Sequence, residues 1–414
     1  MEPTGTTTTD SVHGIDRRTF VVIISLTMAL AALAIDITLP AFATMRQDFG
    51  LPEGSSAVAP VITAALAGLA IGQIAWGPLS DSLGRKVILY SGIAVYVAGA
   101  VGSTLAPTLT ALYLTSFVTG LGASGARVVA LSSVRDTYSA QAMAKTMSYV
   151  MMVFLLVPLI APTLGAAILR FTDWRFIYVF VALAGILVVI VNRRLPETLP
   201  PENRIPLHFG NLARSARFVV TNRLTMGYTL AQTAVFGFFA SYLATSELVI
   251  NEVFGMGRWF TLVFSGFAAL LAVAVVINNQ LLNRLQLRTM LRIAFGGFTV
   301  VAIAFAVMAL ATDGVPPFGV FIAMLAPLLL VHGLLLPNLN AAALIPMGSV
   351  AGTAAAIIGL ISILGGSIIG SFIDRAFNGT ILPLALSAAV LGIISLAFAM
   401  WADKVWDEET AEDR

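Results

Sequence analysis

The chain of 414 residues is 58% hydrophobic and only 11% charged, with a mean hydropathy of +0.93. A soluble domain carries about 25% charged residues, so this composition excludes a soluble globule and indicates an integral membrane protein. The net charge of +2 is too small to suggest a nucleic-acid partner. The absence of cysteine excludes disulfides, and the scattered histidines His13, His208 and His332 offer no metal-ligand spacing, so we expect neither metal nor cofactor.

Apolar segments of about 20 residues, the length that crosses a bilayer, occur along the whole chain. There are twelve: Phe20–Phe42, Ala57–Gly77, Val87–Ala106, Leu109–Leu131, Lys145–Ile168, Arg175–Asn192, Leu224–Ser246, Arg258–Leu281, Leu291–Ala311, Phe318–Ala341, Val350–Ile373 and Gly379–Trp401. The sequence therefore predicts an all-α fold of twelve transmembrane helices in two six-helix bundles, with the lipid bilayer as its surroundings.

An even number of spans places both termini on one side of the membrane. If that side is inside, the inner loops and tails hold 17 of the 23 lysines and arginines, and the outer loops hold five. Because cytoplasmic loops are enriched in cations, we expect cytoplasmic termini. The one long polar stretch divides the chain as follows: a tail at 1–19, a first bundle at 20–194, a linker at 195–223, a second bundle at 224–401 and a tail at 402–414.

The two halves of the chain are weakly similar in sequence. Leu79–Lys86 precedes a similar segment, Leu281–Arg288, by 202 residues, and each follows the second span of its half. Two parallel repeats around a central site are what a secondary transporter needs for alternating access. The halves therefore favour a transporter over other membrane proteins.

Gly77–Val87 matches the loop signature G-x-L-x-D-x-x-G-R-[KR] of the major facilitator superfamily at every fixed position. Further segments resemble the Bcr/CflA-type drug:proton antiporters of that superfamily: Ala34–Pro40, Val134–Asp136, Val157–Gly165, Asp173–Arg175, Pro337-Asn338 and Ala351–Ala354. The resemblance spans Phe20 to Trp401. It implies a multi-pass protein of the bacterial inner membrane that exports drug-like or amphipathic molecules against proton entry, and we expect a monomer.

Asp36 is the first candidate for proton coupling. It is the only acidic residue between Phe20 and Met45, about 9 Å from the outer end of the predicted helix. An intramembrane carboxylate is costly unless it is paired, hydrated or protonated, so it is typical of a proton relay. The alternative is a helix-end acid wetted by the outer vestibule. The family pattern places an arginine in the fourth span where this chain has Ser116, and some relatives have a second acid where it has Met28.

Arg127 is the only arginine that lies more than one residue from the end of a predicted span, and it is about 16 Å deeper than Ser116. The favoured interpretation is an anchor at the cytoplasmic end, snorkelling or paired with Asp81 or Asp136. The alternative is a contact with protons or substrate in an inward-facing cavity.

A charge cluster at the cytoplasmic face is predicted to act as a conformational latch. Its members are Gly77, Asp81, Gly84, Arg85, Lys86 and Asp136. Asp81 is suited to capping the eleventh helix near Gly348–Gly352 when the cavity is closed to the cytoplasm. The second-half copy has Asn283 at the Asp81 position and Gln286 at the glycine position, so we expect a weaker latch there. The alternative is a turn whose cations only set topology.

Small and turn-forming residues mark further helices. Pro158, Pro162 and Gly165 in the fifth span match the antiporter motif, and the prolines should bend this helix. Gly366 and Gly370 would permit close packing of the eleventh span. Candidate residues of the substrate cavity are Gln73, Tyr149, Phe154, Gln232, Phe236, Phe239, His332 and Asn338, each with ordinary helix packing as its alternative.

The leading functional hypothesis is a proton-coupled exporter of drug-like or amphipathic molecules, with the substrate and protons as its partners. A dedicated exporter or facilitator of one endogenous metabolite remains an alternative. A membrane-embedded enzyme or sensor is disfavoured, because the chain lacks a nucleophile with its base, a metal cluster and a large soluble module. We therefore do not expect an enzyme.

Overall fold

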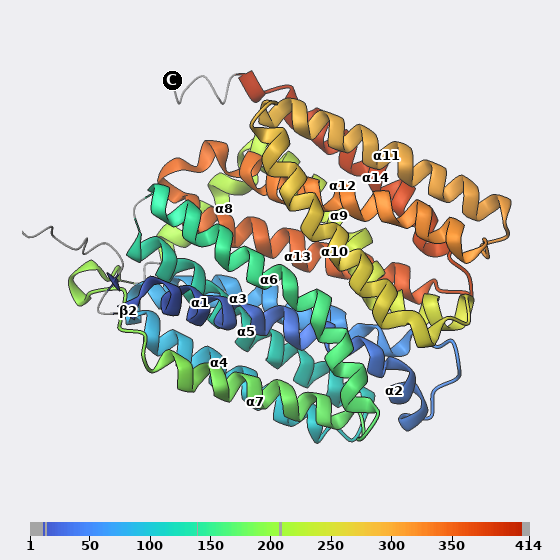
Figure 1. Cartoon of the computed structure of the whole chain (residues 1–414). Coiled ribbons are helices and arrows are strands. Elements are labelled where there is room, and N and C mark those ends of the chain that lie inside the picture. Colours follow the sequence, from blue (N-terminus) through green and yellow to red (C-terminus); the bar gives the residue numbers. More distant parts are fainter. Residues whose placement is uncertain (1–10, 13–14, 139, 207–208, 408–414) are drawn as a thin grey trace, which may run out of the picture.

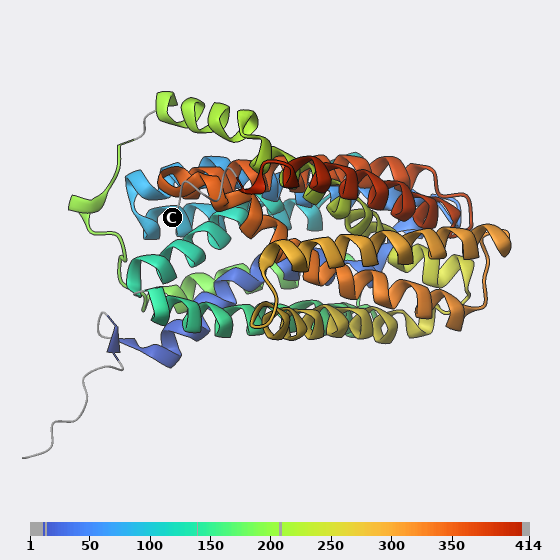
Figure 2. The same ribbon diagram turned by 90° about the horizontal axis from the view of Figure 1, so that it is seen from above.

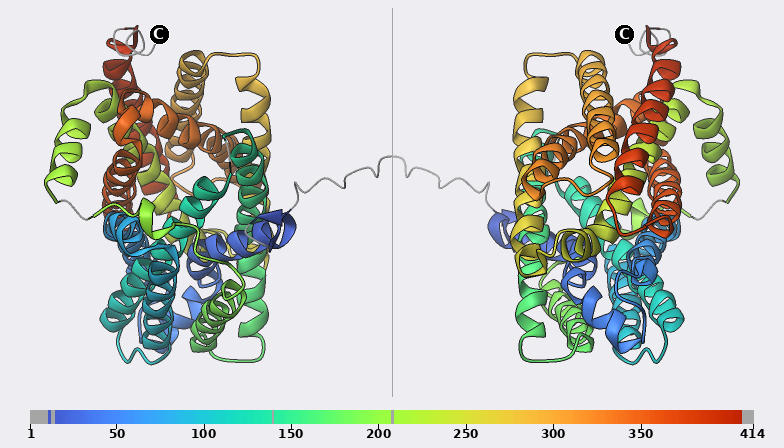
Figure 3. Two further views of the ribbon diagram at one scale, coloured as in Figure 1. Left: turned by 90° about the vertical axis from the view of Figure 1, so that its left-hand side faces the viewer. Right: turned by 90° about the vertical axis from the view of Figure 1, so that its right-hand side faces the viewer.

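The computed structural model describes residues 11–12, 15–138, 140–206 and 209–407. Within these residues, 12 helices are long and apolar enough to cross a membrane. They form two six-helix bundles. In Figure 3 most of the first half, coloured blue to green, lies below the yellow to red second half. The predicted membrane fold is confirmed, apart from a short antiparallel pair, β1 (Ser11–Val12) with β2 (Ile15–Asp16).

The spans of both bundles are long α-helices. The first bundle holds α1 (Arg17–Asp36), α3 (Pro60–Leu83), α4 (Arg85–Thr104), α5 (Leu109–Thr137), α6 (Ala140–Leu169) and α7 (Arg175–Asn192). The second holds α9 (Arg223–Leu248), α10 (Phe260–Leu282), α11 (Leu287–Ala311), α12 (Phe318–Leu344), α13 (Ala351–Arg375) and α14 (Leu382–Asp403). Short connecting helices are η1 (Leu39–Ala41), α2 (Phe42–Asp48), η2 (Ser56–Val58), η3 (Pro201–Asn203), α8 (Phe209–Thr221), η4 (Val249–Val253, a π-helix), η5 (Gly257–Trp259) and η6 (Ile345–Val350).

Several helical segments extend beyond the predicted ends of their spans, and the first two such differences bear on the candidate site. The first span is not one continuous helix to Phe42, because α1 ends at Asp36 and the chain continues through η1 into α2. The second span does not end at Gly77 but continues to Leu83, so most of the predicted charged turn is helical. Only Gly84, with φ of 102°, separates α3 from α4, and a side chain there would strain the backbone.

The start of α1 and the end of α14 lie at the same end of the molecule, on the left in Figure 1. We call this end the termini side and the opposite end the far side. Helix α8, in the linker between the bundles, lies outside the spans in Figure 2 and packs against α13 and α9.

Contacts between the bundles are made mainly by two pairs of helices. Helix α3 packs against α13, and α6 packs against α10. Within the first bundle, α3 and α5 approach so closely that a Cβ at Gly120 would lie 1.9 Å from the carbonyl oxygen of Ala65. Such close backbone approach at glycine is typical of helix packing in membranes.

Candidate functional site

Asp36 lies at the break in the first span, and the sequence explains that break. Pro40 has no N–H, so the backbone carbonyl of Asp36, four residues earlier, cannot accept its helical hydrogen bond. Instead, the chain tightens into i→i−3 bonds, with the Thr38 N–H donating to the Ile35 carbonyl at 3.3 Å and the Ala41 N–H donating to the Thr38 carbonyl at 3.0 Å. The carboxyl group therefore projects from the last residue of a regular helix.

The Asp36 side chain is buried without a neutralising cation. Asp36 is 5% exposed, and no hydrogen bond or ion pair joins its carboxyl group to another described side chain. Ser116 is also buried in α5, so the arginine of the family pattern has no replacement there. The segment η1 that follows Asp36 contacts α9, so this part of the first bundle lies against the second.

Helix α6 is fitted against the break beside Asp36. A Cβ at Gly165 would lie 2.2 Å from the backbone oxygen of Ile37 and 3.2 Å from Pro40. Only glycine allows this approach. Pro158 and Pro162 lie inside α6, which remains one helix from Ala140 to Leu169. The antiporter-motif helix thus supports the backbone next to the candidate proton carrier.

A buried ion pair joins the two bundles on the far side. The Arg46 guanidinium of α2 donates to both carboxylate oxygens of Glu247 in α9, at 2.9 and 3.2 Å, and approaches Glu252 at 3.4 Å. Arg46 is 3% exposed and Glu247 is 4% exposed. A bidentate pair shielded from water is strong while it is intact and costly to leave half-made. Sequence reasoning treated Arg46 as an ordinary outer-loop cation.

The far side is closed along α9 as well. Every residue from Ala240 to Ile250 is buried, whereas Gln232, Phe236 and Phe239 nearer the termini side keep some exposed surface. In the same half of the membrane, the Ser265 hydroxyl of α10 donates to the Leu159 carbonyl of α6 at 2.7 Å. The bundles therefore meet tightly on the far side.

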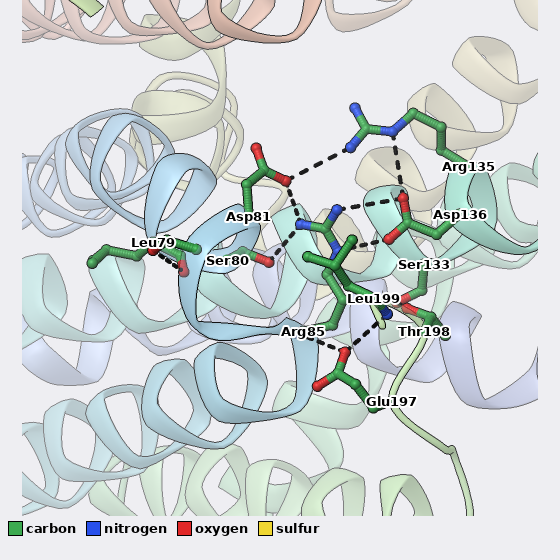
Figure 4. A network of polar contacts seen from close by, with 11 residues as sticks. Leu79, Ser80, Asp81, Arg85, Ser133, Arg135, Asp136, Glu197, Thr198 and Leu199 are labelled. Atoms are coloured by element: carbon green, nitrogen blue, oxygen red, sulfur yellow. Dashed lines mark hydrogen bonds and ion pairs between the residues drawn. The ribbon is translucent and has the colours of Figure 1, made fainter. Parts of the chain in front are cut away.

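On the termini side, Arg85 is the centre of a charge cluster (Figure 4). Its guanidinium is buried and donates to Asp81 at 2.6 Å, to Asp136 at 2.7 Å and to Ser80 at 3.0 Å. Asp81 belongs to α3 and Asp136 to α5, so Arg85 ties three helix ends of one bundle together. The predicted cluster of Asp81, Arg85 and Asp136 exists.

The start of α4 is capped by an acid that sequence reasoning did not select. The Glu197 carboxylate accepts hydrogen bonds from the backbone N–H of Arg85 at 2.9 Å and of Lys86 at 3.1 Å (Figure 4). An anion suits the first turn of a helix, where N–H groups lack partners. The Ile205 N–H donates to the Asp81 carbonyl at 3.0 Å, so the linker is fastened to this loop. Glu197 is far from α4 along the chain, so the sequence alone does not indicate that it caps this helix.

The predicted contact between Asp81 and the eleventh span is not made in this structure. Helix α13 begins at Ala351, and among the described residues Asp81 binds Arg85 and lies 3.8 Å from Arg135 instead. A Cβ at Gly352 would lie 3.8 Å from the Arg135 guanidinium. The prediction concerned a state closed on the termini side, whereas the seal seen here is on the far side.

The second-half copy of the loop is built differently. Asn283 follows the end of α10, and the nearby Arg288 pairs with Asp403 of α14 at 2.5 Å and with Asp407 at 2.8 Å. A cation thus ties helices together in both halves, but through different partners.

Arg127 is not paired with Asp81 or Asp136 in this structure, so the predicted pairing is wrong and snorkelling is the remaining form of the predicted anchor. Those two acids bind Arg85 and lie near Arg135. Arg127 is half-buried in α5, and none of the described residues forms a hydrogen bond or ion pair with it.

The predicted cavity residues fall into separate groups. In the second bundle, Phe239 stacks on His332 with ring centroids 4.4 Å apart and lies 6.1 Å from Phe236. The Gln232 amide oxygen is buried without a hydrogen bond, as are both ring nitrogens of His332.

Other members of that list lie elsewhere. Asn338 is engaged within the second bundle, where it donates to Asn278 at 2.6 Å. The Gln73 amide donates to Leu69 at 3.2 Å and lies at the contact with α13. Phe154 packs in a cluster between α1 and α6. Tyr149 is exposed and lines a pocket with Arg17 at the start of α1.

One further buried acid escaped sequence reasoning. Asp374, one residue before the end of α13, is 2% exposed, and its side chain bonds the Ser241 hydroxyl of α9 at 2.6 Å. The sequence analysis did not select Asp374, because Asp374-Arg375 resembles a charged pair at the start of an ordinary loop. Gly366 and Gly370 of the same helix do meet α9 closely, as predicted.

The model of the Major Facilitator Superfamily matches residues 24–348. The chain belongs to the major facilitator superfamily. It is 29% identical over 390 residues to the uncharacterized MFS-type transporter YdgK of Bacillus subtilis, with 93% of this chain and 96% of that protein covered. It is 28% identical to a bicyclomycin resistance protein homolog of Haemophilus influenzae, with 91% and 94% covered.

Among solved structures, the fold is similar to a D-xylose-proton symporter, with a TM-score of 0.74, 14% identity, and 93% and 97% of the two chains covered. Family and fold are therefore those of major facilitator transporters, and the protein is a multi-pass membrane transporter of small molecules.

Proposed function

We propose that this major facilitator protein exports drug-like or amphipathic molecules in exchange for protons, with Asp36 as the proton carrier. The observation that carries the proposal is the burial of Asp36 without a neutralising cation among the described residues. In a low-dielectric setting such a carboxyl group is stabilised by binding a proton or a cationic group. The name of the Haemophilus influenzae relative, a bicyclomycin resistance protein homolog, supports a drug-like substrate.

Residues 20–194 and 224–401 are the two units that move against each other in this scheme. The cation bias of the loops supports cytoplasmic termini in a bacterial inner membrane, so the sealed far side faces outward. Substrate then enters from the cytoplasm in the state seen here. Its release requires the Arg46–Glu247 pair to part, while a contact on the termini side replaces it.

The cluster of Gly77, Asp81, Gly84, Arg85, Lys86 and Asp136 serves as that termini-side contact. Arg85 holds the ends of α3, α4 and α5 as one rigid platform through Asp81 and Asp136. Asp81 is the member with an accessible side chain, and Arg135 beside it already reaches toward Gly352 of α13. A small approach of the bundles would bring this platform onto the start of α13.

Proton coupling at Asp36 can be tested in proteoliposomes with an imposed pH gradient. Asp36→Asn should abolish proton-driven transport, because the amide cannot take up and release a proton, while counterflow of substrate without a gradient should persist. Asp36→Glu is the matched control that keeps the carboxyl group. Full gradient-driven transport by Asp36→Asn would contradict the proposal.

The substrate class can be tested in an efflux-deficient bacterial host that expresses the protein. We expect several amphipathic drugs to accumulate less in these cells than in cells without it. An uncoupler should remove this difference. Lowered accumulation of one metabolite alone, unaffected by the uncoupler, would favour the dedicated exporter or facilitator.

A further inference from the structure

Arg127 is an intramembrane cation that the described chain leaves unbalanced. It lies ten residues before the end of α5 at Thr137, which is about 15 Å from that end of the helix. A guanidinium stays charged in proteins and can only donate hydrogen bonds. A cation at this depth is costly unless an anion or water meets it. No described side chain supplies that anion, since Asp81 and Asp136 are occupied by Arg85.

The direction in which Arg127 points from α5 can be inferred from the contacts of nearby residues on the same helix. Three residues earlier, Ser124 meets α3 at Gly72, and three residues later, Ala130 packs with α1 residues such as Phe20. Arg127 therefore lies between the directions of α3 and α1. These two helices make little contact with each other, and Arg127 keeps accessible surface.

The second bundle presents a complementary face at the same depth. Gln232, Phe236 and Phe239 recur at spacings of four and three residues, so they share one face of α9, and all three are partly exposed. Gln232 lies nine residues, about 14 Å, from the start of α9, which is similar to the distance of Arg127 from the end of α5. Its amide oxygen is buried without a hydrogen bond, so this acceptor has no partner among the described residues.

From these observations we infer that Arg127 binds the carboxylate of the transported molecule, and that the transporter prefers amphipathic aromatic anions or zwitterions. Arg127 supplies planar donors for a carboxylate, and the Gln232 amide adds a polar partner on the other bundle. Phe236 and the Phe239–His332 stack offer an apolar wall for an aromatic ring. The inference deepens the proposed export function and rests on it.

Three dansyl probes that differ in charge test this site. They are N-dansyl-phenylalanine, its neutral carboxamide and the cation dansylcadaverine, bound to the full chain in phosphatidylcholine nanodiscs, which contain no anionic lipid. We expect the carboxylate to bind about tenfold more tightly than the carboxamide, as a charge-assisted bond predicts. Arg127→Gln should bring the two affinities within about twofold by weakening the carboxylate alone. Arg127→Lys should keep part of the preference, because it retains a point charge.

Arg284→Gln is the control, because Arg284 is exposed in the loop after α10 and should leave all three affinities unchanged. Equal binding of carboxylate and carboxamide by the unaltered protein, or no binding of the carboxylate, would overturn the inference. So would Arg127→Gln if it kept the preference or weakened both probes in parallel, the latter indicating a structural role. If the protein prefers the carboxylate probe but shows no uncoupler-sensitive export in cells, the proposed function is overturned and the inferred binding site is not.

Discussion

At the scale of single residues, the structure separates acids and cations by whether the chain itself neutralises them. Arg46 and Arg85 are buried with carboxylate partners, so their charges serve packing and closure. Asp36 and Arg127 have none among the described residues, which is why we propose that they meet protons and substrate. In the sequence, the paired and the unpaired charges look alike, because each is an isolated charged residue near or within an apolar segment.

Gly165 allows a residue-scale prediction about the support of Asp36. Gly165→Ala places a methyl group 2.2 Å from the Ile37 oxygen, so either α6 or the helix break must shift. We expect a loss of about 1–3 kcal/mol of stability, as for overpacked cores, together with slower proton-driven transport. Thermal unfolding of the purified protein and exchange in proteoliposomes measure the two effects.

The matched control is Gly266→Ala in α10, where an added Cβ meets nothing within 4 Å. This change should be neutral or stabilise the helix by up to about 1 kcal/mol. If both alanine variants behave alike, close packing at Gly165 does not support the break beside Asp36.

At the scale of elements, distant segments determine how helices begin and end. The first span breaks because Pro40 removes one backbone donor, which is readable from the sequence. The start of α4 depends on Glu197 from the linker, 112 residues away, which is not. The connection between α3 and α4 is therefore part of a platform that includes the linker, rather than a free turn.

Glu197→Gln tests this cap. The variant loses the negative charge at the N-terminus of α4, and we expect a loss of about 1 kcal/mol and a lower unfolding temperature. Glu202→Gln is the control, because Glu202 is exposed in η3 and none of the described residues hydrogen-bonds its side chain. Equal unfolding temperatures of the Glu197→Gln variant and the unaltered protein would contradict the capping role.

At the scale of the whole molecule, the polar bonds between the bundles that are described above lie on the far side. The Arg46–Glu247 pair, the burial of Ala240–Ile250 and the Ser265–Leu159 bond all lie on the far side. Arg46 and Glu247 are 201 residues apart, close to the 202-residue offset between the two similar loops, so the lock joins matching ends of the two halves. This closure assigns one end state of the alternating-access cycle to the structure.

Breaking the lock should shift the population toward the outward-open state. The chain has no cysteine, so Phe239→Cys provides a single labelling site near the middle of α9. In right-side-out vesicles, Arg46→Leu should raise labelling of this cysteine by an impermeant maleimide at least tenfold. Loss of a buried ion pair costs several kcal/mol in the closed state, and about 1.4 kcal/mol already changes a population ratio tenfold.

Glu252→Gln is the matched control for this prediction. Glu252 approaches Arg46 at 3.4 Å, but its side chain is 26% exposed and the bidentate partner Glu247 remains. We expect less than a threefold change in labelling. An Arg46→Leu variant that labels no faster than the Phe239→Cys parent would show that the ion pair does not hold the far side closed.

The sequence by itself determined the twelve spans, the two halves and the family, because span length, hydropathy and the Gly77–Val87 signature are local properties of the chain. It also located Asp36 and Arg127, since a charge within an apolar run stands out without any structure. Only the tertiary structure decided which charges are neutralised. Arg46 with Glu247, Glu197 with the start of α4, and Ser241 with Asp374 pair across more than a hundred residues. Burial and pairing depend on which helix faces meet, and that information is distributed over the whole fold.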